Sequence, residues 1–293
     1  MKIRTSCNFC RKNKFREKYK FNNYSILECT NCKFLFRDKI LSHKEEEKLY
    51  DKNYYLELQK EYFSNCLVPN PKDKSRLYDF SQRLDLLESL NTKRSKVRLL
   101  DIGAGTGAFS YLAKKRGWEV YNIEISPFVA EIARKKFNVP VYVGEVTDKR
   151  FKLKGFDVLT FWEAIANIEN TTNLLKTTKN LLSKKGKIGI LTTVVDSWIY
   201  DLAKIIYKFS FGKINYFINE GFPIHHANHF TRKALYKSLK KEGFKIIYVS
   251  NQEIPYKYTK LPKFFLPALF LLGKFAKLWG RTIQVLVIAQ KMN

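Results

Sequence analysis

Apolar residues form two alternating patterns between position 75 and the end of the chain. Continuous apolar runs predict buried strands at 97–102, 119–125, 141–143, 156–161, 187–192, 245–249 and 283–289. Apolar positions at helical spacing predict helices at 75–90, 107–116, 127–137, 171–182 and 231–242. Strands that alternate with helices predict an α/β fold with a doubly wound, mostly parallel seven-stranded sheet.

Four segments fall outside this alternation. Residues 1–40 are basic and carry paired cysteines, and 41–74 is a linker or helical segment that ends near the proline break at 69–71. The main domain, 75–293, contains two insertions, 198–229 and 253–279, in which aromatic residues alternate with lysines. Each insertion is predicted to be a lid over a bound acceptor or an interfacial surface on an anionic membrane. Ordinary core helices are the alternative.

The charge of the chain points to a partner that carries phosphate. Lys and Arg number 54 against 27 Asp and Glu, a net charge of +27. Such a field attracts nucleic acid, lipid headgroups or a pyrophosphate-linked substrate, whereas many of the lysines could equally be solvated surface. The longest uncharged apolar run, 264–273, is shorter than the roughly 18 residues of a membrane span, so no span is expected.

Four cysteines are spaced as metal ligands. Cys7 and Cys10 form one C-x2-C pair, Cys29 and Cys32 form the other, and eighteen residues separate the pairs. This spacing predicts a closed, four-thiolate structural zinc site, with free or disulfide-bonded thiols as the alternative. Because residues 1–40 have few apolar side chains, they are expected to need the metal to fold. Paired cysteines and the lack of an N-terminal secretory apolar run predict a reducing, cytoplasmic setting. Cys66 is read as an ordinary linker residue.

A glycine-rich turn follows the first predicted strand of the main domain. Asp101 ends that strand, and Gly103, Gly105 and Gly107 follow in a G-x-G-x-G pattern. A dinucleotide fold would show G-x-G-x-x-G. Glycines let a ligand approach bare backbone, although such turns also serve strand-to-helix packing. A carboxylate at this position suits a cationic ligand better than a phosphate.

This turn resembles the first motif of the class I S-adenosylmethionine-dependent methyltransferases. The resemblance implies that Glu124, at the end of the second strand, accepts hydrogen bonds from the ribose hydroxyls, and that Glu145 lies near the adenine amine. It also places Phe161, on the following strand, among the cofactor contacts. The implied donor is S-adenosylmethionine, bound by Asp101, Gly103, Gly105, Gly107, Glu124, Glu145 and Phe161.

A zinc ribbon, a tyrosine-rich linker and this core together resemble a bacterial group related to sugar and polysaccharide-pathway methyltransferases. The resemblance implies a small-molecule, sugar or glycan acceptor, which the charge extends to a phosphate-bearing or lipid-linked one. Relatives usually show Glu-His where this chain has Ala166-Asn167. That departure makes metal-assisted transfer doubtful and raises a weakened, merely cofactor-binding protein as an alternative.

Catalytic candidates lie at two places. Glu163 follows the strand predicted at 156–161, and His225, His226 and His229 cluster before the helix predicted at 231–242. The family position implies His226 as a base for the acceptor hydroxyl, with His225 beside it. Helix capping or lid packing is the alternative role for these histidines. An RNA methyltransferase is the competing enzyme, since a ribbon and a basic surface both suit nucleic acid. Against it, no Asn/Asp-Pro-Pro-Tyr type motif follows the fourth strand, so nucleic acid is the less favoured partner.

Overall fold

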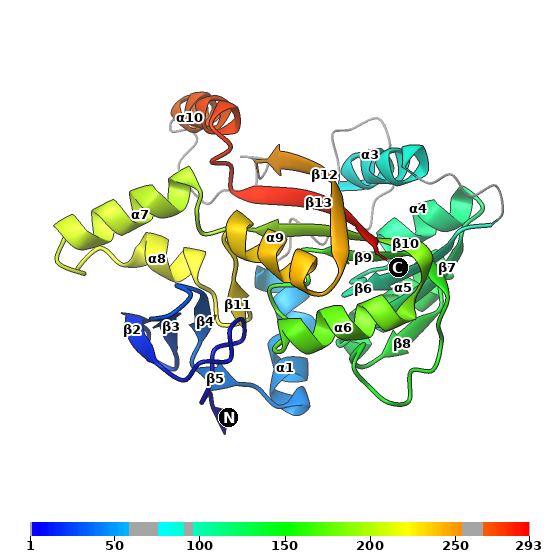
Figure 1. Cartoon of the computed structure of the whole chain (residues 1–293), viewed down its shortest axis with the longest axis horizontal. Helices are drawn as coiled ribbons and strands as arrows, with labels where there is room; N and C mark the ends of the chain where they lie inside the picture. The colour runs from blue at the N-terminus through cyan, green and yellow to red at the C-terminus, as the bar shows by residue number, and fades with distance from the viewer. Residues whose placement is uncertain (1, 59–75, 91–95, 254–265, 293) are drawn as a thin grey trace. The chain divides into compact units, whose positions relative to one another are not determined.

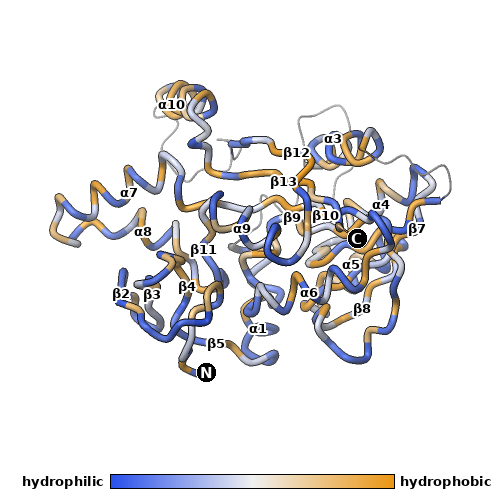
Figure 2. Tube along the Cα trace, in the orientation of Figure 1, coloured by the Kyte–Doolittle hydropathy of each residue, from blue (hydrophilic) through white to orange (hydrophobic). Residues whose placement is uncertain are grey.

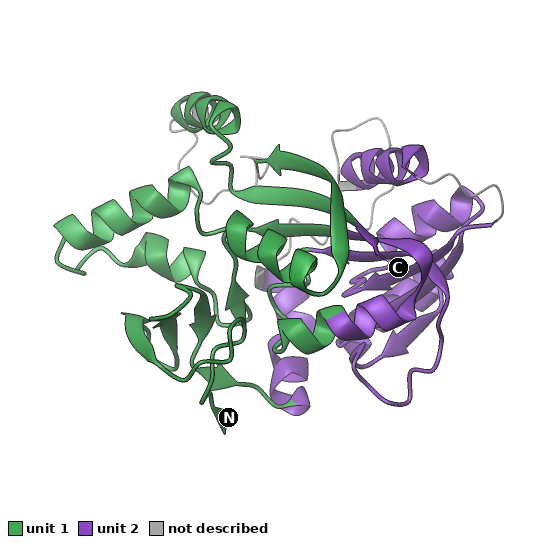
Figure 3. Cartoon of the chain, in the orientation of Figure 1, with its two compact units in different colours: residues 1–42, 163–175, 190–289 green, residues 43–162, 176–189, 290–293 purple. Residues whose placement is uncertain are grey.

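A computed structural model describes residues 2–58, 76–90, 96–253 and 266–292 (Figure 1). The break predicted at 69–71, Cys66 and the 254–265 part of the second insertion lie outside these residues. The chain divides into two compact units (Figure 3). Unit 1 comprises Met1–Ser42, Glu163–Leu175 and Ile190–Ala289; unit 2 comprises His43–Trp162, Lys176–Gly189 and Gln290–Asn293. Each unit is assembled from separated segments, so the predicted domain limits near 40 and 74 stay a prediction.

A seven-stranded sheet has the order β12-β13-β10-β9-β6-β7-β8. Strand β6 pairs in parallel with β7 and with β9, and β7 pairs in parallel with β8. The predicted α/β fold with its mostly parallel sheet is confirmed. The strands are β6 (Arg98–Ile102), β7 (Glu119–Glu124), β8 (Val141–Val143), β9 (Phe156–Trp162), β10 (Leu182–Thr193), β12 (Phe244–Gln252) and β13 (Gln284–Lys291).

All five predicted helices of the main domain are present, and local sequence explains their limits. Pro127 begins one of them, because its fixed φ suits the first helical turn, and Asn138 ends it in a left-handed conformation at φ 49°. Thr231 caps another by accepting a hydrogen bond from the amide of Ala234 at 3.1 Å. The helices are α3 (Arg76–Ser89), α4 (Ala108–Lys115), α5 (Pro127–Phe137), α6 (Thr171–Leu181) and α9 (Arg232–Lys241).

The N-terminal segment folds as two small antiparallel sheets. In one, β1 (Lys2–Ile3) pairs with β5 (Lys39–Ile40). The other has the order β11-β4-β3-β2, with β2 (Phe15–Lys20), β3 (Ser25–Cys29) and β4 (Leu35–Arg37). Its fourth strand, β11 (Asn228–His229), comes from the first insertion and pairs Asn228 with Phe36. The insertion therefore completes the sheet of the N-terminal module.

The N-terminal module and the first insertion share one apolar core within unit 1. The insertion forms α7 (Trp198–Phe209) and α8 (Tyr216–Gly221). Tyr19 of the module packs on Phe222 with ring centroids 4.9 Å apart, and Tyr24 donates a hydrogen bond to the carbonyl of Phe222 at 2.6 Å. The buried members of this shared core are Tyr19, Ile26, Leu35, Val195, Tyr200, Ala203, Ile218 and Phe222. The short N-terminal segment thus completes its core with side chains from a distant part of the chain.

The remaining helices lie in the linker and in the second insertion. The linker contains α1 (His43–Leu49) and a π-helical turn η1 (Tyr54–Leu58), and the second insertion contains α10 (Leu266–Leu278). Figure 2 shows α10 largely in the colours of apolar residues. Among the described residues, no helix is long and apolar enough to cross a membrane.

Candidate active site

The glycine turn is held by the strand beside it. After β6, the amides of Gly103 and Ala104 both donate to the carbonyl of Ile123 on β7, at 2.9 and 3.2 Å. Gly103, Gly105 and Gly107 have φ values of 71°, 54° and 75°, a left-handed region that other residues adopt only at a cost. The turn then leads into α4; along it Gly103 is exposed, Gly105 is half-buried and Gly107 is buried.

Gly105 and Gly107 are glycines for different physical reasons. A Cβ at Gly107 would lie 2.7 Å from Cγ2 of Val139 and 3.0 Å from Cβ of Ala133, so this glycine lets α4 approach α5 closely. A Cβ at Gly105 would meet no atom within 4 Å among the described residues. Packing therefore accounts for Gly107, while Gly105 presents bare backbone to open space, as a ligand cradle requires.

Two buried carboxylates flank this turn. Glu124 accepts hydrogen bonds from the amide of Gly105 at 2.8 Å and from the amide of Ser126 at 3.0 Å. Asp101 accepts one from the hydroxyl of Thr160 at 2.6 Å. Burial raises the pKa of Asp101 from 3.8 to about 7, and burial also raises the pKa of Glu124. Both side chains would be more stable as anions beside a cation, so they fit a positively charged ligand.

Glu145 and Phe161, the other predicted cofactor contacts, differ in exposure. The amide of Gly144 bonds to the carbonyl of Glu124 at 3.0 Å, which brings the residue that follows, Glu145, to the end of the neighbouring strand. Glu145 is half-buried and accepts a hydrogen bond from Thr147 at 3.1 Å. Phe161 is fully buried within β9. The cofactor roles of both residues stay predictions.

Several residues near this turn could not be recognised as part of the site from the sequence. Thr160 reaches Asp101 because the parallel register places the two opposite each other. The hydroxyl of Ser126 donates to the carbonyl of Tyr50 at 2.6 Å, so the tyrosine-containing linker lies against the turn that holds Glu124. The guanidinium of Arg83 lies 5.0 Å from the Trp162 ring, whose buried Nε1 has no hydrogen-bond partner among the described residues. A polar contact from a bound molecule would satisfy that nitrogen.

Comparison with known proteins identifies the family. A family model described as a methyltransferase domain matches residues 73–249. The chain belongs to this methyltransferase family. An uncharacterised methyltransferase of Staphylococcus carnosus (strain TM300) is 30% identical over 148 residues, which make up 49% of this chain and 69% of that protein. The predicted enzyme class is confirmed: the protein is an S-adenosylmethionine-dependent methyltransferase.

Solved structures confirm the fold of the methyltransferase. An S-adenosylmethionine-dependent methyltransferase from Archaeoglobus fulgidus superposes with a TM-score of 0.52 at 16% identity, covering 75% of this chain and 97% of that one. Magnesium protoporphyrin IX methyltransferase from Synechocystis PCC 6803, with bound SAH, gives 0.55 at 11% identity, covering 82% and 98%. The open backbone at Gly105 and the two buried carboxylates fit S-adenosylmethionine, the donor that this family uses.

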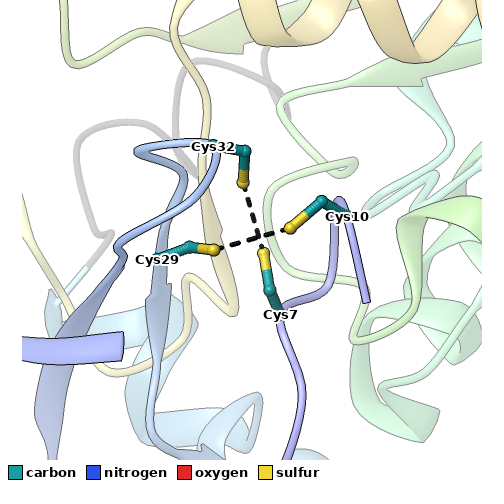
Figure 4. Close-up of side chains that lie close together, drawn as sticks. All are labelled: Cys7, Cys10, Cys29 and Cys32. Atoms are coloured by element: carbon teal, nitrogen blue, oxygen red, sulfur yellow. Dashed lines mark hydrogen bonds between the residues drawn. The ribbon is translucent and has the colours of Figure 1, made fainter. Parts of the chain in front are cut away.

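The four predicted metal ligands of the methyltransferase converge. Figure 4 shows the sulfur atoms of Cys7, Cys10, Cys29 and Cys32 pointing toward one another. All four lie within 4.8 Å of one another, with Cys7 and Cys32 at 3.6 Å and Cys10 and Cys29 at 3.5 Å. A zinc ion with Zn–S bonds of about 2.3 Å in a tetrahedral site separates its sulfurs by about 3.8 Å. The cluster has the size of a zinc site, and no disulfide joins these cysteines.

The N-terminal module, residues 2–40, carries the four cysteines and is called the cysteine module below. A buried ion network connects it to the loop after β9. Arg4 and Arg37 each pair with one carboxylate oxygen of Glu169, and the amide of Leu41 also donates to it at 3.2 Å. Beside it, Asn8 donates to the side chain of Asn228 at 2.6 Å. Sequence spacing gives no sign of this network, because Arg4 and Glu169 are 165 positions apart.

The histidine cluster of the methyltransferase is held neutral. His225 and His226 stack edge to face with ring centroids 4.7 Å apart, and the His226 ring lies 5.8 Å from that of His229. Burial, with the nearby positive charge of Arg37, lowers the pKa of His225 to about 4 and of His229 to about 3. Burial, with the neighbouring histidines and Arg37, places the pKa of His226 well below its usual value. Near neutral pH these rings therefore accept hydrogen bonds but take up protons weakly.

Glu163 and the Ala166-Asn167 pair lie in the loop that follows β9. Glu163 has a left-handed φ of 64°, and its carboxylate accepts a hydrogen bond from the side chain of Gln284. The carbonyl of Ala166 accepts the amide of Asn228 at 2.9 Å, so the loop is fastened to β11. Glu163, His225 and His226 belong to unit 1, whereas the glycine turn belongs to unit 2. Their catalytic roles stay predictions.

Proposed function

We propose that this methyltransferase transfers a methyl group to a small-molecule, sugar or lipid-linked glycan acceptor. The observation that carries the proposal is the docking of the cysteine module on the loop after β9, through Arg4, Arg37 and Glu169. In open parallel sheets the ligand crevice lies beyond the carboxyl ends of the strands, so this loop borders the expected acceptor. The combination of ribbon and core supports an enzyme similar to sugar and polysaccharide-pathway methyltransferases.

The donor side of the reaction is assigned to the glycine turn. S-adenosylmethionine, when bound, supplies a methyl group on a positively charged sulfur. Gly105 offers the open backbone for it, Asp101 supplies a buried carboxylate that favours a cation, and Glu145 is assigned to the adenine end. Glu124 accepts hydrogen bonds from the backbone amides of Gly105 and Ser126 and also interacts with that of Ile125. A carboxylate has about four acceptor positions, so acceptor capacity remains for a ribose hydroxyl.

His226 is assigned to orient the acceptor. Its neutral ring accepts a hydrogen bond from an acceptor hydroxyl, and its low pKa makes positioning the larger part of its role. Glu163, fixed by Gln284, and His225, stacked on His226, are assigned to support it. Because Ala166 and Asn167 replace the Glu-His of relatives, transfer without a catalytic metal is the favoured mechanism.

The four cysteines are assigned to a structural zinc ion. A closed four-thiolate site leaves zinc no open coordination position, so the ion would stabilise the N-terminal module rather than react. Its ligands must stay reduced, which supports a cytoplasmic location. Metal analysis of the purified protein tests this assignment: about one zinc per chain is expected, falling to background when Cys7 and Cys29 are both replaced by serine.

Radiolabelled methyl transfer tests the acceptor class. The protein is incubated with methyl-labelled S-adenosylmethionine and separated host fractions of soluble metabolites, lipid-linked glycans, polysaccharide and RNA. Label in a carbohydrate-bearing or small-molecule fraction is expected. His226→Ala should lower the rate by about 10²-fold, within the range of a lost acid–base or orienting group. His43→Ala, at an exposed histidine of α1, is the matched control.

RNA is the second candidate acceptor, favoured by the net charge of +27. Label that accumulates in the RNA fraction, together with RNA binding that falls steeply with salt, would replace the proposal by this alternative. Binding of S-adenosylmethionine without label in any fraction would instead support a catalytically weakened protein, in line with Ala166 and Asn167.

A further inference from the structure

The two insertions expose aromatic side chains that a soluble surface rarely shows. On α7, the exposed Leu202, Ile205 and Phe209 share one face because they are three and four positions apart. The opposite face, which includes Tyr200 and Ala203, is buried in the core shared with the N-terminal module. A helix that is apolar on both faces normally has a partner on each, and this one has a partner on the inner face.

The turn after α7 holds a second aromatic outward. Phe211 is 93% exposed and has a left-handed φ of 52°, which is costly for a bulky residue. Its amide bonds to the carbonyl of Lys208 at 3.1 Å, and the amide of Gly212 bonds to that of Tyr207 at 2.8 Å. The turn is therefore a fixed structure that presents an aromatic ring to its surroundings.

The helix α10 is exposed on nearly all sides. Between residues 267 and 279, only Gly273 and Ala276 are buried. Leu278 is 80% and Trp279 is 76% exposed, and Phe270 and Phe275 are each about half exposed. Thirteen residues are too few to cross a bilayer, which needs about 20. A helix of this length and composition suits burial in the plane of an interface.

One anchor within unit 1 fastens both segments. The amide of Trp198, at the start of α7, donates to the carbonyl of Arg281 at 2.9 Å, just after α10. The guanidinium of Arg281 pairs with the carboxylate of Asp201 on the first turn of α7. Both helices therefore project from the same point of the unit, as Figure 1 shows.

The charges around these side chains indicate what covers them. Residues 198–213 contain three lysines and one acidic residue, Asp201, which pairs with Lys204 and Arg281. Residues 266–281 contain two lysines and an arginine and no acidic residue, so the balance of the surface is positive. Lys274 lies 4.5 Å from the centroid of the Phe270 ring, so cationic and aromatic groups are interleaved at close range. Lysine beside exposed phenylalanine, leucine and tryptophan complements a surface that is anionic outside and apolar beneath.

We propose that α7, its following turn and α10 form an interfacial surface that binds the anionic face of a lipid bilayer. The aromatic and leucine side chains enter the boundary between headgroups and acyl chains, while the lysines contact lipid phosphates. Phosphate alone, as in RNA, would leave the leucine and phenylalanine side chains in water. This role is independent of the acceptor's identity, although a lipid-linked acceptor would meet the enzyme at such a surface.

Vesicle flotation of the full chain tests the surface. Co-flotation with vesicles of phosphatidylcholine and phosphatidylglycerol is expected, with much weaker binding to phosphatidylcholine alone. Replacing both Phe211 and Phe275 by serine should lower partitioning at least about ten-fold, since each substitution removes an apolar side chain that the bilayer would bury. Lys274→Gln with Lys277→Gln should weaken binding to anionic vesicles only. Leu153→Ser, an exposed apolar residue elsewhere, is the matched control.

Tryptophan fluorescence gives a second readout. Trp118 and Trp162 are buried and Trp198 is half-buried, so a blue shift on adding anionic vesicles should come from Trp279 and disappear in Trp279→Phe. Affinity for S-adenosylmethionine should stay unchanged in all these variants, which shows that they fold.

Two flotation results would overturn the proposal: no flotation with anionic vesicles, or flotation that neither pair of substitutions changes. Two results in the absence of vesicle binding would also overturn it. One is a dimer that dissociates when Phe211 and Phe275 are both replaced, and the other is loss of methyl transfer to a soluble acceptor in the same variant. The dimer would assign the surface to a second copy, and the lost transfer would assign it to a lid.

Discussion

Gly105 and Gly107 lie in one loop and share a left-handed backbone, yet they face different surroundings. Gly107 packs on Ala133 and Val139, whereas Gly105 opens to free space. The G-x-G-x-G pattern does not distinguish the two glycines. Only the residues around each one show which glycine is needed for packing and which faces open space.

This difference predicts that alanine at Gly107 mainly lowers stability, whereas alanine at Gly105 mainly weakens binding. Gly107→Ala should lower the free energy of unfolding by about 1–3 kcal/mol, because its Cβ overlaps side chains that have little room to move. Gly105→Ala should cost only about 1 kcal/mol of backbone strain but weaken S-adenosylmethionine binding at least about ten-fold. Denaturant unfolding and calorimetry measure the two quantities. Equal binding losses in both variants would contradict the assignment.

Asp101 predicts a pH dependence. Its folded-state pKa, about 7, exceeds the ordinary 3.8, so the folded chain binds this proton more tightly than the unfolded one does. Its contribution to stability is therefore complete below pH 4 and is lost as pH rises toward 7. Between pH 4 and 8, the free energy of unfolding should fall by on the order of 2–4 kcal/mol more in the wild type than in Asp101→Asn.

The same titration affects the donor. Affinity for S-adenosylmethionine should strengthen from pH 6 to pH 8 as Asp101 ionises, and this rise should vanish in Asp101→Asn. Calorimetry at several pH values measures it; a wild-type affinity that is flat with pH would argue against a direct electrostatic role for this carboxylate.

At the scale of elements, the loop after β9 is fixed by distant residues. Glu169 is paired with Arg4 and with Arg37, whose side chain is only 1% exposed. Two buried arginines destabilise the folded state unless the carboxylate between them compensates their charge. The loop, β11 and the cysteine module are therefore held together by direct contacts within unit 1.

Neutralising Glu169 should be strongly destabilising. Glu169→Gln leaves two arginines without a counter-charge and should lower the free energy of unfolding by about 3–5 kcal/mol. Glu131→Gln on α5 removes an exposed, solvent-screened pair with Lys135 and should leave the free energy of unfolding almost unchanged. Denaturant unfolding compares them, and similar small effects in both variants would mean that the Glu169 network adds little.

At the scale of the whole molecule, the cysteine module depends on the first insertion for its core. Tyr19, Ile26 and Leu35 are buried against side chains of α7, α8 and the residues that follow them. A metal at the cysteines would thus stabilise residues more than 150 positions away.

Metal removal should reveal this dependence. With a strong chelator, hydrogen exchange should quicken in β2 to β4 and also in α7 and α8, because they share one core. Exchange in β6 and β7, which belong to the other unit, should change little. Quickening confined to the residues between Cys7 and Cys32 would show that the insertion is stable without the module.

The sequence alone determined the features that depend on local pattern. Apolar spacing specified the strands and helices of the main domain, since periodicity records which side of an element is buried. The glycine turn with Asp101 and Glu124 indicated the donor, and the spacing of Cys7, Cys10, Cys29 and Cys32 indicated a cluster that the structure brings together. Each of these signals lies within a few tens of residues of chain.

Tertiary structure alone decided how separated segments meet. The register that sets Thr160 against Asp101, the pairing of β11 with β4, and the joining of Arg4 to Glu169 all follow from packing across long loops. Such contacts depend on complementary shapes and charges that exist only after the loops have closed, so no local period encodes them. For the same reason, only the tertiary structure showed that Gly107 packs on Ala133 and Val139 and that the histidines are buried beside Arg37.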